Sequence, residues 1–454
     1  MDVSRATAGA TEHLTYQLDR LPLTPLHWAI AILCAFGLSF DVIEAALGYA
    51  LSAAFSGPPY HIAPYQLSLL LGSIFAGGAI GAPLLGWLAD RSGRRLALRL
   101  SLLALTATSL LAAASASVAW LTFFRLLSGT ALGAYPPLMV AYLSDVLPAA
   151  RRGMLILLVG AIGFLGAPAV VLLIRWLTPL QPFGLEGWRC ALIIGAFGAA
   201  ATGAAFRMLP ESPRWLIAAG RCEPAIDVYN RFMRHAGCEP VRPGTALQVP
   251  APDVERPSFW FGAARAYRPR TTFLCALYFL SPWATIGFPL LSGAVLVEKG
   301  FRVADSLLYL GVSLFGPSIG VLAGAAFIDR IERRTTLLLS ATAMAVTGVW
   351  FAIANAPWLL MATGMAFNLV GSIYVGALSI YGAELFPTAL RATVSSTAWA
   401  VNRITSALVP LALLPLLKSA GALAMTAAIA LALCVSAALI LAFDERGLSG
   451  KPVV

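Results

Sequence analysis

Charged residues are scarce in this sequence. Asp, Glu, Lys and Arg make up 11% of its 454 residues, whereas 59% of the residues are hydrophobic. An average water-soluble domain has about 25% charged residues. A soluble chain of this length has no way to hide so much apolar surface. The composition therefore excludes a soluble globular protein and predicts that the lipid bilayer surrounds most of the chain.

Side chains that bind metals or act as catalytic bases are also few. The four histidines fall outside the centres of the long apolar runs, at His13, His27, His61 and His235. The cysteines lack C-x-x-C spacing, which indicates buried, unreactive thiols rather than disulfides or a metal site; they are Cys34, Cys190, Cys222, Cys238, Cys275 and Cys434. An enzyme embedded in the membrane needs a nucleophile with its base, or metal ligands, within the apolar runs. None is visible there, so we predict no enzyme activity, no cofactor and no metal.

What the sequence does contain is long apolar runs. About 20 apolar residues suffice to cross a bilayer as a helix, and runs of this kind lie at 28–55, 65–89, 96–114, 118–143, 152–177, 187–209, 271–298, 303–328, 335–354, 357–382, 388–417 and 421–443. The sequence therefore predicts an all-α polytopic membrane protein with about twelve transmembrane helices. Its expected parts are an N-terminal six-helix half at 1–209, a linker at 210–270 and a C-terminal six-helix half at 271–454.

The linker is hydrophilic, basic and rich in proline. Its apolar residues Ile226, Tyr229 and Phe232 have helical spacing between Pro224 and Gly237, which predicts a short amphipathic helix. A second is expected at 258–267. We expect both to lie on the inner leaflet, attracted by anionic lipids.

Basic residues are divided unequally between alternate loops. The formal net charge is +10. One side of the predicted topology carries Arg5, Arg20, Arg91, Arg94, Arg95, Arg151, Arg152, Arg214, Arg330, Arg333, Arg334 and Arg391, whereas the other carries only Arg175, Arg189, Lys299, Arg302 and Lys418. This distribution is the positive-inside bias, which places both termini in the cytoplasm, and it argues against nucleic-acid binding as the reason for the charge.

Two short polar motifs occur twice with a single offset. The first, between the second and third runs, places Asp90 among arginines in a tight turn, and the second begins at Asp145. The repeats lie 239 positions later: Asp90, Asp145, Pro148 and Arg152 correspond to Asp329, Glu384, Pro387 and Arg391. Four matches in one register indicate two homologous halves, as in transporters built from parallel repeats.

With these motifs in view, the sequence resembles the major facilitator superfamily. The stretch Gly86–Arg95 meets the superfamily pattern G-x-L-A-D-R-x-G-R-R, and its second copy departs from the pattern at Ala325 and Glu332. Pro210–Leu216 resembles the motif that closes the first half in sugar porters and in metabolite:proton symporters. The resemblance implies gating roles at the cytoplasmic ends of the helices for Gly86, Asp90, Arg91, Gly93, Arg94, Asp145, Arg152, Asp329, Arg330, Glu384 and Arg391. The alternative is that the basic loops only fix topology.

Charged residues inside the runs are costly and therefore candidates for function. Asp41 and Glu44 lie three residues apart on one side of the first run, and Arg125 lies in the fourth. A carboxylate that alternates between a protonated and an ion-paired state suits proton coupling. The segment Arg125–Gly133 resembles the R-x-x-x-G-x-x-x-G motif, whose Arg neighbours a proton-linked Asp in related symporters, so we favour Asp41 as its partner. The alternative is a permanent salt bridge that fixes helix packing.

Arg403 lies near the middle of the eleventh run. A guanidinium there suits bidentate binding of a substrate carboxylate, although it could instead pair with an internal acid, most plausibly Glu44. The surrounding pattern resembles the aromatic-acid and nicotinate-like branch, with Thr405-Ser406 in place of two glycines. Further candidates for substrate contact lie on the runs expected to line the cavity: Asn402, Tyr374, Asn368, Trp283 and Phe279.

These observations predict a secondary transporter that imports a small organic anion with a proton, works as a monomer and sits in a cell membrane, the inner membrane of a bacterium. A sugar or polyol porter is the main alternative, although the seventh run lacks the Gln-Gln pair of such porters. Efflux by proton antiport remains open, because Gly160, Gly163, Gly166 and Pro168 resemble an antiporter motif at imperfect spacing. A sensor or scaffold without transport is a third alternative.

Overall fold

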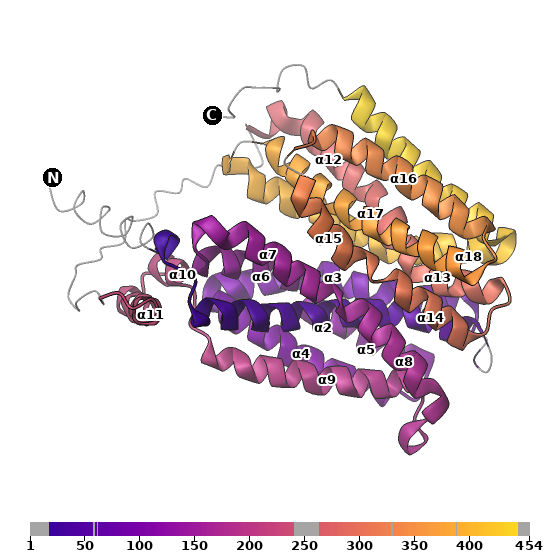
Figure 1. Ribbon diagram of the computed structural model, residues 1–454, viewed down its shortest axis with the longest axis horizontal. Coiled ribbons are helices and arrows are strands. Elements are labelled where there is room, and N and C mark those ends of the chain that lie inside the picture. Colours follow the sequence, from indigo (N-terminus) through magenta and orange to yellow (C-terminus); the bar gives the residue numbers. More distant parts are fainter. Residues whose placement is uncertain are drawn as a thin grey trace.

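The described part of the chain is entirely helical, with no strand. The computed structural model describes residues 18–57, 60, 62–239, 263–327, 330–386 and 388–443. The N-terminal half contains α2 (Pro25–Ser56), α3 (Pro64–Ser92), α4 (Arg94–Ala113), α5 (Val118–Leu132), α6 (Tyr135–Val146), α7 (Ala149–Phe164), α8 (Gly166–Leu180) and α9 (Gly187–Ala205). The C-terminal half contains α12 (Ala263–Thr285), α13 (Gly287–Glu298), α14 (Val303–Ser313), α15 (Gly316–Phe327), α16 (Arg333–Ile353), α17 (Pro357–Glu384) and α18 (Thr388–Ala442). The two halves lie side by side (Figure 1).

Among the described residues, eleven helical segments are long and apolar enough to cross a membrane. The last of them, at 394–442, has 49 residues. At 1.5 Å per residue it would extend about 74 Å, more than twice the roughly 30 Å core of a bilayer. Gly421 divides it with a φ of 81°, and the chain reverses direction within α18 (Figure 1). The prediction of about twelve transmembrane helices in two halves is confirmed.

Four of the spans are broken near their middle, each time shortly before a proline. The breaks separate α5 from α6, α7 from α8, α12 from α13, and α14 from α15. The prolines that follow them are Pro136, Pro168, Pro289 and Pro317. A proline has no N–H to donate and its ring crowds the preceding turn, so it favours a break at this position.

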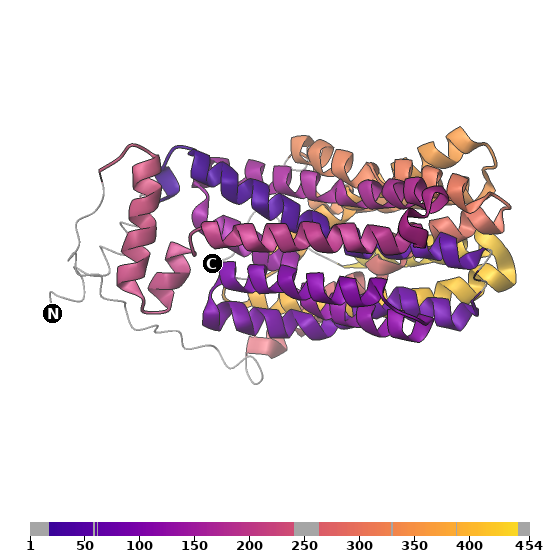
Figure 2. The same ribbon diagram turned by 90° about the horizontal axis from the view of Figure 1, so that it is seen from below.

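The described part of the linker forms two short helices that pack beyond one end of the N-terminal half, α10 (Pro213–Ala218) and α11 (Cys222–His235), as both ribbon views show (Figures 1 and 2). We call this the linker end. The predicted amphipathic helix is present as α11, and its apolar face packs against protein. Ile226, Tyr229 and Phe232 are buried in the same core as α2, and the rings of Phe232 and His27 lie 5.1 Å apart. Burial raises the pKa of Tyr229 to about 12. The second predicted helix falls mostly outside the described residues.

Two hydrogen bonds join the halves in the part of the molecule away from the linker end. Ser68 Oγ of α3 donates to the carbonyl of Pro410 in α18 at 2.9 Å, and Arg175 Nε of α8 donates to the carbonyl of Ala304 in α14 at 3.1 Å. Close packing accompanies these bonds, since a Cβ on Gly293 of α13 would lie 2.9 Å from the Cβ of Ala53 in α2. At the linker end, the hydrogen bonds and ion pairs among the described residues stay within one half or the other.

Candidate functional site: charges within the spans and a polar cluster at the linker end

Glu44 and Arg125 form a buried ion pair inside the N-terminal half. Arg125 Nη1 lies 3.2 Å from Glu44 Oε1, and Nη2 donates to the backbone carbonyl of Glu44 at 3.1 Å. Ser109 Oγ of α4 donates to the other carboxylate oxygen at 3.3 Å. Arg125 is fully buried and Glu44 is 3% exposed. The expected partner of Arg125 was Asp41, so the predicted pairing is wrong: the guanidinium contacts the second acid of the helix.

Glycines explain how α5 comes close enough to place Arg125. A Cβ on Gly129 would lie 2.0 Å from the carbonyl oxygen of Ile74 in α3, and one on Gly133 would lie 2.4 Å from that of Gly78. Gly77 meets the backbone of α5 in the same way, 1.9 Å from the carbonyl oxygen of Leu126. Small residues at this spacing let two membrane helices touch along their backbones. The glycines of the R-x-x-x-G-x-x-x-G motif therefore serve helix packing.

Asp41 of α2 and Arg403 of α18 are the other two charges within the spans, and they come from different halves. Both side chains are half-buried. No acidic oxygen of the described residues lies within 4.0 Å of the Arg403 guanidinium, so the expected alternative of an Arg403–Glu44 pair is not formed.

Arg403 and two tryptophans of α12 and α18 have buried N–H donors without an acceptor among the described residues. The guanidinium carbon of Arg403 lies 5.0 Å from the centre of the Trp399 ring. Arg403 Nε, Trp399 Nε1 and Trp283 Nε1 are all buried and without a hydrogen-bond partner among the described residues. Each unsatisfied buried donor costs about 1–3 kcal/mol. Donors left unpaired at mid-span favour a ligand rich in acceptor atoms.

The other expected substrate residues differ in what they contact. Asn402 Nδ2 donates to Ser281 Oγ at 3.0 Å, which joins α18 to α12. Asn368 Nδ2 donates to the carbonyls of Gly364 at 2.9 Å and Ser313 at 3.4 Å.

Two aromatic candidates complete this set. The hydroxyl of Tyr374 shares a 2.9 Å hydrogen bond with Ser436 and its ring is fully buried. Phe279 is 44% exposed. The contacts of Tyr374 and Asn368 support packing roles, and they leave Arg403 and Trp283 as the stronger candidates for ligand contact.

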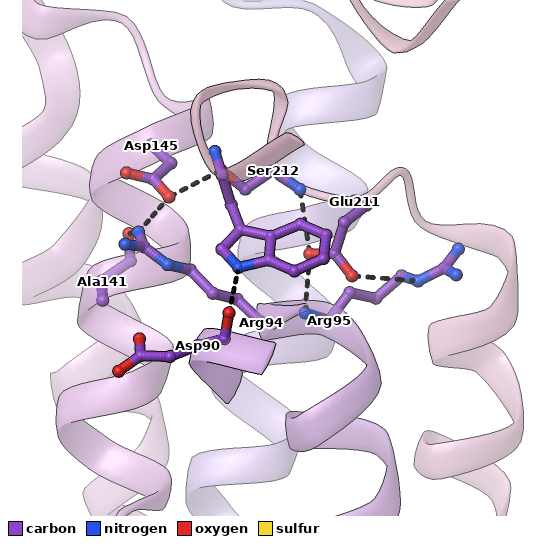
Figure 3. Close-up of polar contacts among 8 residues, drawn as sticks. Asp90, Arg94, Arg95, Ala141, Asp145, Glu211 and Ser212 are labelled. Atoms are coloured by element: carbon purple, nitrogen blue, oxygen red, sulfur yellow. Dashed lines mark hydrogen bonds and ion pairs between the residues drawn. The ribbon is translucent and has the colours of Figure 1, made fainter. Parts of the chain in front are cut away.

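At the linker end, the loop motif and the linker form one polar cluster (Figure 3). Arg94 forms an ion pair with Asp145 at the end of α6 and donates to the carbonyl of Ala141 at 3.2 Å. Ser212 Oγ donates to the same Asp145 carboxylate at 2.6 Å and accepts from the backbone N–H of Trp215 at 3.0 Å. Asp145 thereby holds the α3–α4 turn and the linker together.

Glu211 occupies the space beside the turn itself. Its Oε1 accepts from the backbone N–H groups of Arg95 at 2.9 Å and Ser212 at 3.0 Å. Gly93 has a φ of 108° and a ψ of 151°, and a Cβ there would lie 2.4 Å from Glu211 Oε2. Both the backbone conformation and the carboxylate therefore require glycine at this position. By contrast, a Cβ on Gly86 would meet nothing within 4 Å.

The remaining expected gating residues of this half lie around the cluster. The Asp90 side chain is exposed, and among the described residues only its backbone carbonyl is engaged, by Trp215 Nε1 at 3.0 Å (Figure 3). The Arg91 guanidinium lies 5.5 Å from the centre of the exposed Trp87 ring. Arg152 and Arg214 both bind one oxygen of Asp19, just before α2.

The second copy of the motif reproduces the central contact. Arg333 Nε lies 3.4 Å from Glu384 Oε1, and these two residues correspond to Arg94 and Asp145. Glu332 stands at the position of Gly93 with a φ of −55°, which any residue adopts. Arg330 is exposed. Asp329 and the side chain of Arg391 lie outside the described residues.

Sequence reasoning missed several members of this cluster. Glu211, Ser212 and Trp215 belong to the motif at 210–216, whose resemblance to a family pattern was noted without a physical role. Their signal was available, since a serine followed by proline and an apolar turn predicts a helix N-cap. Asp19 had no such signal, because a single acid in a polar N-terminal segment has no periodicity to place it.

Comparisons with known proteins agree with this geometry. The family model described as sugar (and other) transporter matches residues 28–444. The niacin transporter NiaP of Acinetobacter baylyi is 25% identical to this chain, with 88% of this chain and 89% of that protein aligned. The inner membrane metabolite transport protein YdjE of Escherichia coli is 29% identical, with 95% and 96% aligned. A partially occluded inward-open structure of the E. coli xylose transporter XylE superposes with a TM-score of 0.74 at 16% identity, covering 93% of this chain and 99% of that one.

Proposed function

Because the chain belongs to the sugar (and other) transporter family and has the major facilitator fold, we propose that it imports a small organic anion, an aromatic or other monocarboxylate, together with a proton. A secondary transporter of this fold is a carrier and not an enzyme. Transport proceeds by alternating access, with the two halves rocking about a site between them.

The observation that carries the substrate class is the environment of Arg403. A guanidinium keeps its charge at any physiological pH and offers a planar fork of donors that matches a carboxylate. It lies near mid-span, 5.0 Å from the centre of the Trp399 ring, whose N–H is without a partner among the described residues, as is that of Trp283. Aromatic rings beside a cation suit a planar acid. The relative from Acinetobacter baylyi, named a niacin transporter, is consistent with such a substrate.

Sugar transport is the second candidate, because the matching family model is described as sugar (and other) transporter and a similar solved structure is that of a xylose transporter. A sugar hydroxyl both donates and accepts, so its site needs acceptors as well as donors. The unpartnered groups that α12 and α18 offer at mid-span are N–H donors. This difference favours an acid over a sugar.

We also propose that the linker end faces the cytoplasm, as the distribution of arginines suggests, and that a single chain in the inner membrane of a bacterium is the working unit. In this orientation the two hydrogen bonds that join the halves lie toward the outer side, and we propose that this arrangement corresponds to an inward-facing state. Among the described residues the Asp90 carboxylate has no partner, which is consistent with its release in that state. We propose that it binds neighbouring helix ends when the carrier faces outward.

The test begins with the substrate and proceeds to the proton. Uptake of a carboxylate library into cells, with and without a protonophore, identifies an acid that depends on the proton gradient. The purified protein is then placed in proteoliposomes, and pH-gradient-driven uptake is compared with exchange of labelled for unlabelled substrate. Asp41→Asn imitates the protonated acid permanently, so uptake against a gradient should fail whereas exchange should survive. If Asp41→Asn still accumulates substrate, coupling resides in Glu44 or elsewhere.

A further inference from the structure

His27 joins the first span to the second linker helix. It is the third residue of α2, and its side chain is fully buried. Its ring lies 5.1 Å from that of Phe232 in α11. Phe232 belongs to the core that also contains Leu26 and Ile30 of α2. The contact between the two rings therefore holds α11 against the beginning of the first span.

The hydrogen bonds of His27 determine its protonation state. Nδ1 accepts from the backbone N–H of Thr24 at 3.1 Å and lies 2.7 Å from Thr24 Oγ1. Because a backbone N–H can only donate, Nδ1 has to be unprotonated in this arrangement. The arrangement is a capping box, in which His27 occupies the position usually held by Glu or Gln. Unlike Gln, histidine loses its acceptor when it takes a proton near neutral pH.

A protonated ring fits poorly at this place. Nδ1 would become a donor that faces the N–H of Thr24, and the positive charge would be buried at the N-terminus of a helix, where the helix dipole disfavours it.

The surrounding elements offer little compensation for such a charge. Their titratable and charged groups are Glu223, Asp227, Tyr229, Arg231, Arg234 and His235 on α11, Tyr142 and Asp145 on α6, Arg151 and Arg152 on α7, and Asp19 and Arg20 before α2. Asp19 and Asp145 are already bound by arginines, and no carboxylate oxygen of the described residues lies within 4.0 Å of the His27 ring. The folded arrangement therefore favours the neutral ring.

The contact belongs to a short stretch of chain that also holds the first linker helix. Asp19, eight residues before His27, binds Arg214 of α10 and Arg152 of α7. Leu18 and Leu21 are buried in the same core as Phe232. Residues 18–27 thus attach both linker helices to the N-terminal half, α10 through Asp19 and α11 through His27.

We propose that His27 is a proton-dependent attachment point for the linker: the unprotonated ring holds α11 on α2, and protonation releases α11. An imidazole ordinarily titrates near about pH 6.5, so α11 is attached at neutral pH and is released as the pH falls. This inference goes beyond the proposed function, and only the origin of the proton rests on it. In the proposed orientation the proton comes from the cytoplasm, which uptake of an acid with a proton makes more acidic.

The experiment is hydrogen exchange of the backbone amides in the purified full-length protein, measured between pH 8 and pH 5 and divided by the intrinsic exchange rate at each pH. If release of α11 needs one proton on His27, the protection factor of residues 222–235 falls about tenfold per pH unit below about pH 6.5. Residues 333–353 of α16, in the other half, serve as the internal reference and should not change.

Two variants assign the effect to one histidine. His27→Gln keeps an acceptor at the capping-box position but takes no proton, so α11 should be protected equally at all these pH values. His235→Gln is the matched control, because it removes the exposed histidine of the same helix, and it should keep the wild-type slope. A wild type whose α11 has the same protection at pH 8 and pH 5 would overturn the proposal, as would a His27→Gln variant that keeps the slope.

Nuclear magnetic resonance of the histidine rings decides the question on the wild type if His27→Gln does not fold. Of the signals of the four histidines, one that remains in His235→Gln should titrate only together with the loss of α11 protection. Titration of all four while this protection stays constant refutes the proposal. Neither measurement uses a substrate, so failure of the proposed anion uptake and failure of this inference are seen separately.

Discussion

Gly93 and Gly86 belong to one motif, and the structure predicts opposite outcomes when each becomes alanine. Gly93 has a φ of 108° and a ψ of 151°, a region that costs other residues about 1–3 kcal/mol. Its new Cβ would lie 2.4 Å from Glu211 Oε2. Moving that carboxylate breaks at least one charge-assisted hydrogen bond, to Arg95 or Ser212, which costs about 1.5–3 kcal/mol. Gly93→Ala should therefore lose about 2.5–6 kcal/mol of stability.

The control position, Gly86, lies seven residues before Gly93 in the same motif. Gly86 is inside α3 and a Cβ there meets nothing within 4 Å, so Gly86→Ala should gain about 0.5–1 kcal/mol from the greater helix propensity of alanine. The measurement is the melting temperature of the purified protein in one detergent, together with the yield of folded protein from the membrane.

A further variant separates the two sources of the loss. Adding Glu211→Ala to Gly93→Ala removes the collision with the carboxylate and leaves the backbone strain, so the double variant should melt no higher than Glu211→Ala alone. The reasoning is refuted if Gly93→Ala melts at the temperature of Gly86→Ala, because neither the strain nor the collision would then be present.

Three further predictions concern the charged side chains. Asp90→Asn should reduce uptake while the amount of folded protein in the membrane stays unchanged, and normal transport at normal expression would show that the loop only fixes topology. Arg403→Lys should weaken binding of an acid on the order of tenfold to a hundredfold but scarcely alter binding of its amide, and equal effects on acid and amide would make Arg403 structural. Glu44→Gln leaves Arg125 buried without a counter-charge and should lower the free energy of unfolding by about 3–5 kcal/mol, measured as a loss of folded yield. Wild-type stability of this variant would contradict a buried ion pair between Glu44 and Arg125.

The repeat was the part of the fold that could be predicted most fully from sequence. The offset of 239 positions relates equivalent contacts as well as equivalent residues. The Arg94–Asp145 ion pair of the N-terminal half corresponds to the Arg333–Glu384 ion pair of the C-terminal half. It also accounts for the departures. Glu332 fits at the position of Gly93 because the backbone there has a φ of −55°, and alanine fits at 325 because its counterpart Gly86 has open space around it.

The choice of partner for each acid could not be predicted. Asp41 and Glu44 are three residues apart, so they differ by about 60° around the helix axis. That rotation sends Glu44 toward α4 and α5 and Asp41 away from them, and only the packing of α2 determines it. For Tyr374 and Asn368, too, the sequence did not determine whether their side of the helix faces the cavity or a neighbouring helix. For the linker helix, an apolar face indicated burial but did not reveal whether lipid or protein covers it.

The buried ion pair of Glu44 and Arg125 also constrains how the protein is inserted into the membrane. The two residues are 81 positions apart in the chain, which takes about 4–16 s to synthesise at 5–20 residues per second. During that interval the first helix carries two acids and no cation, and each charge at the centre of a span costs about 2.5–3.5 kcal/mol on insertion scales. The first helix therefore has to remain beside the translocon, or enter the bilayer with protonated acids, until the fourth helix arrives. Membrane integration of this half is a cooperative event completed only when Arg125 has emerged.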